Sequence, residues 1–188
     1  MCGAPARLWL SFFLAAVCGC DRQFVVGVTK AAAGGRKPVD AGSDLVPGTG
    51  NGLRAQYFSS KDLSGPPLTR IDPNVDFVWN SAAPDPAVPI DFSAVWTGQV
   101  EARYSETYTF HASVDDGARL WIDGTQLIDA WTAGPQELSG EIALIAGRRH
   151  DIRLEFVDFN FRAIARLFWS SPSQRKEIIP RAYLYPPP

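Results

Sequence analysis

The sequence predicts an all-β protein, an antiparallel β-sandwich or barrel of about nine short strands that follows a signal peptide and a flexible linker. From residue 53 onward, short segments alternate apolar and polar residues, and turn signals separate them at intervals of about 8–12 residues. No stretch of about ten residues keeps the i, i+3, i+4, i+7 spacing of an amphipathic helix. Aromatic residues make up 12% of the 188-residue chain, which suits strands joined by tight turns.

Composition excludes several classes of function. Hydrophobic residues are 46% of the chain, so a folded core is expected, and the formal net charge of −2 argues against a nucleic-acid partner bound through charge. All three cysteines, Cys2, Cys18 and Cys20, precede residue 21. The rest of the chain therefore has no disulfide, thiolate metal site or cysteine nucleophile. His111 and His150 lack the spacing of a zinc site.

The first 19 residues have the pattern of a lipoprotein signal peptide. Arg7 precedes an apolar run over 8–17, which is too short to span about 30 Å of hydrocarbon. Val17-Cys18-Gly19-Cys20 resembles a bacterial lipobox, which implies cleavage after Gly19 and lipidation of Cys20. Cys18 remains the alternative lipidated residue, and an ordinary signal peptide is a second reading. The expected location is the cell envelope, anchored by lipid, with inner or outer membrane left open.

Residues 20–51 are predicted to form a flexible linker. Gly, Ala, Pro and Asp dominate the segment, and a Gly-rich coil of this length spans roughly 30 Å root-mean-square. An alternative places an edge strand at Phe24–Val28. The folded domain is then 52–188.

The strands of this domain follow from period-two alternation. In 93–102, for example, Trp96 and Val100 fall on one face, and in 107–114 Tyr108 and Phe110 do. The expected strands are 53–58, 75–79, 93–102, 107–114, 118–123, 142–146, 152–156, 162–169 and 178–185.

Turn chemistry separates these strands. Asp123-Gly124 is a two-residue hairpin signal. Asp116-Gly117 lies between the two best-patterned strands and predicts a second turn there. The segment 81–89 contains three prolines, which exclude a central strand and indicate a surface crossover.

Several motifs, taken together and in order, resemble one family. They are Gly52–Phe58 (GLRAQYF), Phe92–Gly98 (FSAVWTG), Tyr108–Phe110 (YTF), Ser113–Gly124 (SVDDGARLWIDG), Leu144–Gly147 with Ile152–Phe156, and Ala165–Trp169 (ARLFW). They are similar to the β-barrel domain first recognised in anthrax protective antigen, the PA-fourteen domain, over about residues 52–185. Members of that family occur in bacterial glycosidases, toxins and adhesins and in yeast flocculins, and many are implicated in carbohydrate binding.

The resemblance implies a calcium site. In sugar-binding members, two consecutive Asp residues joined by a cis peptide hold Ca²⁺, an Asn from a later loop completes the site, and sugar hydroxyls bind the ion. Asp115 and Asp116 match the acid pair, and Asn160 is the expected third ligand. Ca²⁺ takes six to eight oxygen ligands, which adjacent carboxylates help to supply. The usual Gly-containing loop is replaced by Phe161-Arg162 here.

Two of these residue assignments have structural alternatives. Asp115-Asp116-Gly117 also suits an ordinary turn with Gly117 at positive φ. Trp131 is a candidate for stacking on a sugar ring, and it also suits packing over the end of the barrel.

The sequence as a whole predicts a surface-anchored, Ca²⁺-dependent, lectin-like module that is not an enzyme. Its expected partner is a glycan, and its only expected membrane contact is the lipid anchor. The alternative is a metal-free interaction or structural module displayed on the envelope, with an envelope protein as its partner.

Overall fold

The computed structural model describes residues 48–188 except 81, 133, 160 and 161. The predicted signal peptide, Cys20 and the linker up to residue 47 lie outside the described residues, so those expectations remain predictions. Among the described residues, no helix is long and apolar enough to span a bilayer.

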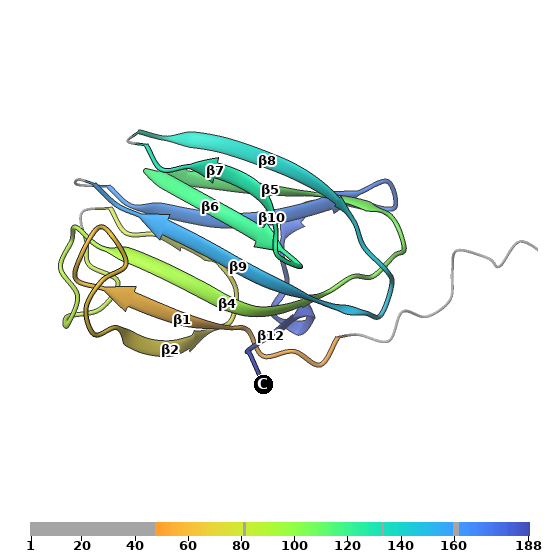
Figure 1. Cartoon of the computed structure of the whole chain (residues 1–188), viewed down its shortest axis with the longest axis horizontal. Coiled ribbons are helices and arrows are strands. Elements are labelled where there is room, and N and C mark those ends of the chain that lie inside the picture. The colour runs from red at the N-terminus through yellow and green to blue at the C-terminus, as the bar shows by residue number, and fades with distance from the viewer. Residues whose placement is uncertain (1–47, 81, 133, 160–161) are drawn as a thin grey trace, which may run out of the picture. The chain divides into compact units, whose positions relative to one another are not determined.

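The described residues form two antiparallel sheets (Figure 1). The seven-stranded sheet has the order β2-β1-β4-β9-β6-β7, with β12 also paired to β4. Its strands are β1 (Leu53–Phe58), β2 (Leu68–Asp72), β4 (Ser93–Glu101), β6 (Gly117–Ile122), β7 (Thr125–Ala130), β9 (Arg149–Val157) and β12 (Leu184–Tyr185).

The five-stranded sheet has the order β11-β10-β5-β8, with β3 also paired to β10. Its strands are β3 (Asp76–Val78), β5 (Thr107–Asp115), β8 (Gln136–Ala143), β10 (Ile164–Ser171) and β11 (Gln174–Ile178). A single 3₁₀ turn, η1 (Arg181–Tyr183), precedes β12. The all-β, antiparallel, sandwich-like prediction is confirmed, with twelve described strands instead of about nine.

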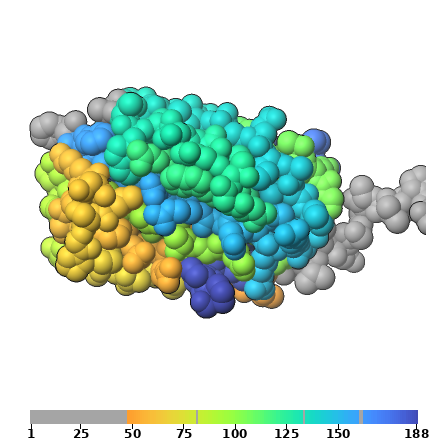
Figure 2. Space-filling model, in the orientation of Figure 1, coloured from red at the N-terminus to blue at the C-terminus, as the bar shows by residue number. Residues whose placement is uncertain are grey.

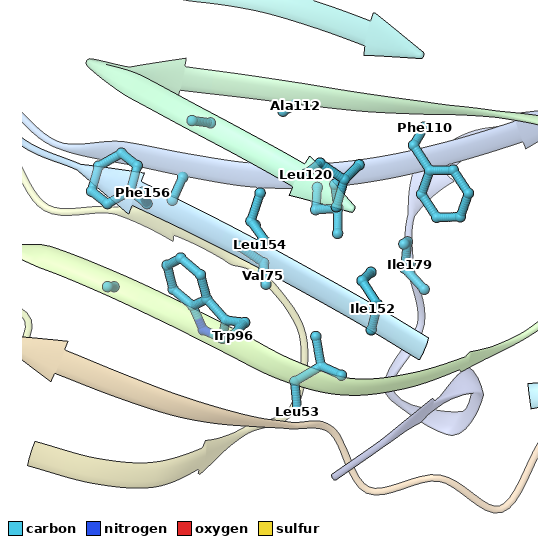
Figure 3. Close-up of a cluster of buried hydrophobic side chains, with 14 of the residues drawn as sticks. Leu53, Val75, Trp96, Phe110, Ala112, Leu120, Ile152, Leu154, Phe156 and Ile179 are labelled. Carbon is cyan, nitrogen blue, oxygen red and sulfur yellow. The ribbon is translucent and has the colours of Figure 1, made fainter. Parts of the chain in front are cut away.

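The core consists of the inward positions of these strands. Trp96, Leu154 and Leu120 lie opposite one another on β4, β9 and β6, and all three are fully buried (Figure 3). In the other sheet, the buried residues of β5 are Tyr108, Phe110, Ala112 and Val114. Each large apolar side chain buried in this way contributes about 1.5–3 kcal/mol. The predicted inward faces of β4 and β5 are therefore confirmed.

One buried carboxylate ties β1, β2 and β4 together. Asp72 Oδ2 accepts hydrogen bonds from the Tyr57 hydroxyl at 2.6 Å and from Trp96 Nε1 at 2.8 Å. Arg70 Nε reaches Asp72 Oδ1 at 2.7 Å. Burial and the neighbouring Asp72 charge raise the pKa of Tyr57, so its hydroxyl stays a donor at neutral pH.

Several strand predictions need correction. The strands β2 and β11 were missed, because each is only five residues long and has a single buried residue. The strand expected at 142–146 is instead β8, which ends at Ala143 and has no fully buried residue. The strand expected at 178–185 is interrupted, because Pro180 has no N–H to donate and η1 follows it.

The two predicted turns had different outcomes. Asp123 and Gly124 both have positive φ, 47° and 75°, and they join Ile122 directly to Thr125, as the hairpin prediction requires. Asp116 and Gly117 do not close a hairpin, because β5 and β6 belong to different sheets. The φ angle of Gly117 is not positive, so the ordinary-turn alternative was wrong on that point. The described part of 81–89 contains no strand, as expected.

Candidate functional site

The acid pair lies where the chain leaves one sheet for the other. Asp115 is the last residue of β5 and pairs with Ile164 of β10. Gly117 opens β6 and pairs with Val157 of β9. The peptide bond between Asp115 and Asp116 is cis. Both acids therefore sit at one end of the two sheets, beside the loop after β7 and the loop after β9.

Asp116 fastens both of these loops. The residue is 3% exposed, and each of its carboxylate oxygens accepts a hydrogen bond from a backbone N–H: Oδ1 from Gly134 and Oδ2 from Phe159, both at 2.6 Å. The two donors belong to the loop after β7 and the loop after β9. Short hydrogen bonds to an ionised acceptor are among the stronger ones in proteins. The orientation of the Asp116 carboxylate is therefore fixed.

Further contacts bring the loop after β7 close to the acid pair. Gln136 Nε2 lies 3.3 Å from the Asp116 carbonyl oxygen and 3.2 Å from the Thr132 carbonyl oxygen. A Cβ on Gly117 would lie 2.9 Å from the Ala130 carbonyl oxygen, closer than real Cβ atoms approach. Glycine is required at 117 by this close approach.

Asp115 differs from Asp116 in exposure and charge environment. Its side chain is half-buried. Burial, and then the negative charge of Asp116, raise the pKa of the Asp115 carboxyl, while Arg162 opposes the shift. Two carboxylates on consecutive residues thus repel each other, and a cation between them would relieve that repulsion.

Trp131 lies in the same loop as Thr132 and Gly134. The Arg119 guanidinium stacks over the Trp131 ring at 4.4 Å from its centroid, within the range of a cation–π interaction. Arg119 is itself held by Asp129 at 3.1 Å and by Glu155 at 3.6 Å. The ring is half-buried and packs against Arg119, and both of its predicted roles remain predictions.

A third segment reaches the site through Lys61, which follows β1. Its ammonium group donates to the Phe159 carbonyl oxygen at 2.7 Å and pairs with Asp91 at 2.9 Å. Phe159 is therefore bound on both sides of its backbone, by Asp116 and by Lys61. The exposed Arg162 partly balances the charge of the acid pair.

The donor set fits an oxygen-seeking cation only in part. Asp115 and Asp116 supply two carboxylates, and each Asp116 oxygen keeps lone-pair capacity beyond its one backbone donor. Within the part of the chain that the structure describes, no cluster of three or more His, Cys, Asp or Glu side chains is placed to hold a metal ion. Any Ca²⁺ would need further oxygens from backbone carbonyls, from Asn160, from water or from a ligand.

Sequence reasoning found the acid pair and missed what holds it. Asn160, the expected third ligand, and Phe161 lie outside the described residues. The backbone donors of Gly134 and Phe159 carried no signal, because every non-proline residue has an N–H. Lys61 carried none either, since it lies 98 residues before its acceptor, Phe159.

The structure defines an antiparallel β-sandwich in which two consecutive acids lie at the crossover between the two sheets. The chain belongs to the PA14 domain family, which matches residues 50–182. This confirms the resemblance drawn from the sequence motifs.

Three similar proteins have been characterised by sequence or structure. The anti-sigma-I factor RsgI3 of Acetivibrio thermocellus is 50% identical over 141 residues, which cover 74% of this chain and 22% of that protein. The structure of an anti-sigma factor domain-containing protein has a TM-score of 0.72 and 48% identity, covering 75% of this chain and 49% of that one. A PA14 sugar-binding domain from an RTX adhesin has a TM-score of 0.57 and 20% identity, covering 72% and 98%.

The coverages show that this chain shares a domain with these proteins but matches only part of each anti-sigma factor protein. The chain spans about a fifth of the length of RsgI3 and about half of the solved anti-sigma chain. The adhesin domain shares the fold, at an identity too low to carry its ligand across.

Proposed function

We propose that this domain is a Ca²⁺-dependent carbohydrate-binding module held at the cell envelope. The observation that carries the proposal is the acid pair: Asp116 is locked by two backbone donors, and Asp115 beside it is destabilised as an anion. The acid pair concentrates negative charge at one place, and the charge of Arg162 offsets it only in part. A divalent cation complements such a site, and sugar hydroxyls complete its oxygen ligands.

The proposed role of the ion is to bind hydroxyl oxygens of a neutral sugar. Asp115 and Asp116 would hold the ion, and Asn160 is proposed as a further ligand. Trp131 would stack against the apolar face of the sugar ring. A site of this size is expected to bind one sugar weakly, with Kd on the order of 0.1–1 mM. Many anchored copies would then supply avidity.

The same geometry supports binding without catalysis. Hydrolysis of a glycosidic bond uses two carboxyl groups on opposite sides of the bond, at least about 5 Å apart. Asp115 and Asp116 are consecutive, and both oxygens of Asp116 are engaged by backbone N–H groups. Neither feature suits an acid–base pair.

The test is a glycan array probed with the full chain in 1 mM Ca²⁺, roughly a hundredfold above a sensor-type Kd, and in EDTA. Glycan binding should require Ca²⁺ and disappear in Asp115→Asn. Glu141→Gln is a matched control, because Glu141 lies on β8 opposite Thr109, which is about 20 Å before Asp115 along β5. Binding that survives EDTA would contradict the calcium part, and a blank array at high valency would contradict the whole proposal.

A second candidate function is a protein-interaction module. It is favoured by the two relatives of about half identity, both described as anti-sigma factor proteins. In this case, envelope extract should yield one protein partner in the presence of EDTA, and Asp115→Asn should leave that capture unchanged.

The proposed attachment is a lipid on Cys20. Cys20→Ser should move the chain from the membrane fraction to the soluble fraction, because one thioether-linked lipid group with its acyl chains provides the anchor. Unchanged membrane association would count against this anchor, and release by Cys18→Ser alone would reassign it to Cys18.

A further inference from the structure

A pocket of about 260 Å³ opens on the seven-stranded sheet and shares no residue with the acid-pair site. It is lined by Trp121, Gly124, Asp151, Ile152 and Arg153. These residues come from β6, from its hairpin turn and from β9. In Figure 2 the blue surface of β9 lies directly below the green-to-teal surface of β6 and β7, on the face toward the viewer.

The strand pattern explains why this pocket has an aromatic wall. Leu120 and Ile122 point into the core and are fully buried, so Trp121 between them points to the opposite, outer face. On the neighbouring strand, Arg153 lies directly opposite Trp121. Gly124 at the turn has no heavy atom within 4 Å of where a Cβ would be, so nothing closes that side of the pocket.

The polar groups at the rim are held in place. Gln99 Nε2 donates to Asp151 Oδ1 at 3.0 Å, and the backbone N–H of Asp151 donates to Asp123 Oδ1 at 2.9 Å. Arg153 donates from Nε and Nη2 to Glu155 Oε1 at 3.0 and 2.6 Å. An acceptor and a donor group therefore flank the indole in fixed positions, which lowers the entropic cost of binding.

The charges, strand pairing and volume of this pocket favour some classes of ligand over others. Asp151 and Arg153 have opposite charges, so the rim favours neither a polyanion nor a polycation. A peptide cannot add to the sheet here, because β6 is paired with β7 and β9, and β9 with β4 and β6. A neutral sugar ring has an apolar face for the indole and hydroxyls that both donate and accept. The volume lies just below the range of about 300–1,000 Å³ typical of drug-sized ligands, which suits one or two rings.

We propose that the Trp121 pocket is a second carbohydrate site, which binds a neutral pyranose by stacking on Trp121 and by hydrogen bonds to Asp151 and Arg153. Trp121 lies five residues after Asp116 along β6, a separation of about 16 Å in a strand. The Trp121 pocket contains neither acid of the pair. Binding there requires no calcium and stands whether or not the acid pair binds a glycan.

The test follows indole resonances of the ¹⁵N-labelled full chain in EDTA. Cellohexaose, xylohexaose and mannohexaose are titrated separately to 10 mM, and the Trp121 signal is assigned by its loss in Trp121→Phe. At least one sugar should shift the Trp121 indole saturably, together with the Asp151 and Arg153 amides. The Trp131 indole should stay unchanged.

Variants separate the site from general destabilisation. Trp121→Ala should weaken binding at least tenfold, Trp121→Phe should retain part of it, and Trp131→Ala should have no effect. Absence of shifts with all three sugars would overturn the proposal, as would shifts that persist in Trp121→Ala. Saturation of the pocket by a neutral aromatic peptide, but by no sugar, would also overturn it.

Discussion

The backbone N–H of Phe159 donates a 2.6 Å hydrogen bond to Oδ2 of Asp116, which lies 43 residues earlier in the chain. With the bond from Gly134 to the other oxygen, Asp116 joins the β5–β6 crossover to two loops. Asp115, the next residue toward the N-terminus, remains partly accessible with a raised pKa. Asp116 is thus fixed in position by two backbone donors, and Asp115 beside it remains accessible to a ligand.

Asp116→Ala should destabilise the protein strongly. The substitution leaves two backbone N–H groups without their charged acceptor, and each such hydrogen bond contributes about 1.5–3 kcal/mol. We expect the free energy of unfolding to fall by about 3–6 kcal/mol, measured by denaturant titration. Asp116→Asn keeps one acceptor oxygen and should lose less. Equal, small losses in both variants would show that the two bonds contribute little.

Asp115→Asn should stabilise the calcium-free protein at neutral pH. A raised folded-state pKa means that the ionised carboxylate is less stable in the folded than in the unfolded chain. Asn removes this cost. Because Asp115 is only half-buried and solvent screens its charge, the gain should stay below about 1 kcal/mol.

The pH dependence of this gain has a defined sign. The difference between Asp115→Asn and wild type should be complete above the raised pKa and should fade as pH falls through it toward the ordinary value of 3.8. Paired melting curves in EDTA between pH 3 and about pH 7 measure it. A difference that grows toward acid would contradict the raised pKa.

Asp72→Ala should also destabilise the protein strongly. It leaves the Tyr57 hydroxyl and the Trp96 indole N–H buried without their acceptor, and it unpairs Arg70. A loss of about 3–5 kcal/mol is expected. Asp76→Ala, which removes the exposed partner of Arg166, is the control and should cost less than about 1 kcal/mol.

Trp131→Ala should weaken calcium-dependent glycan binding about 3- to 10-fold, since an aromatic contact contributes about 0.5–1.5 kcal/mol. Trp131→Phe should recover part of the affinity. Affinity electrophoresis with a glycan identified on the array measures both variants. An unchanged affinity in Trp131→Ala would restrict this ring to packing against Arg119.

The predictable parts of this protein are those that depend on residue type and spacing. Trp96, Leu120 and Phe110 are buried as their period-two positions require, and Asp123-Gly124 forms the hairpin that its chemistry favours. β8 was misplaced because every second residue of it is exposed and none is fully buried, so its pattern resembles that of a loop.

The candidate site divides in the same way. Asp115 and Asp116 were found through a sequence motif, and such a motif depends on the residue types at given positions. The bonds from Gly134 and Phe159 join backbone atoms to a carboxylate across loops, and no residue type marks them. The Trp121 pocket arises from the register of β6 against β9, which sequence periodicity leaves open.

The central claim is that a cation held by Asp115 and Asp116 binds a glycan. Its most direct measurement is calorimetric titration of the best array glycan into the full chain, once with saturating Ca²⁺ and once with EDTA, for wild type and Asp115→Asn. The account predicts saturable heat with a Kd on the order of 0.1–1 mM only for wild type with Ca²⁺. Equal affinity in EDTA, or in Asp115→Asn, would contradict it.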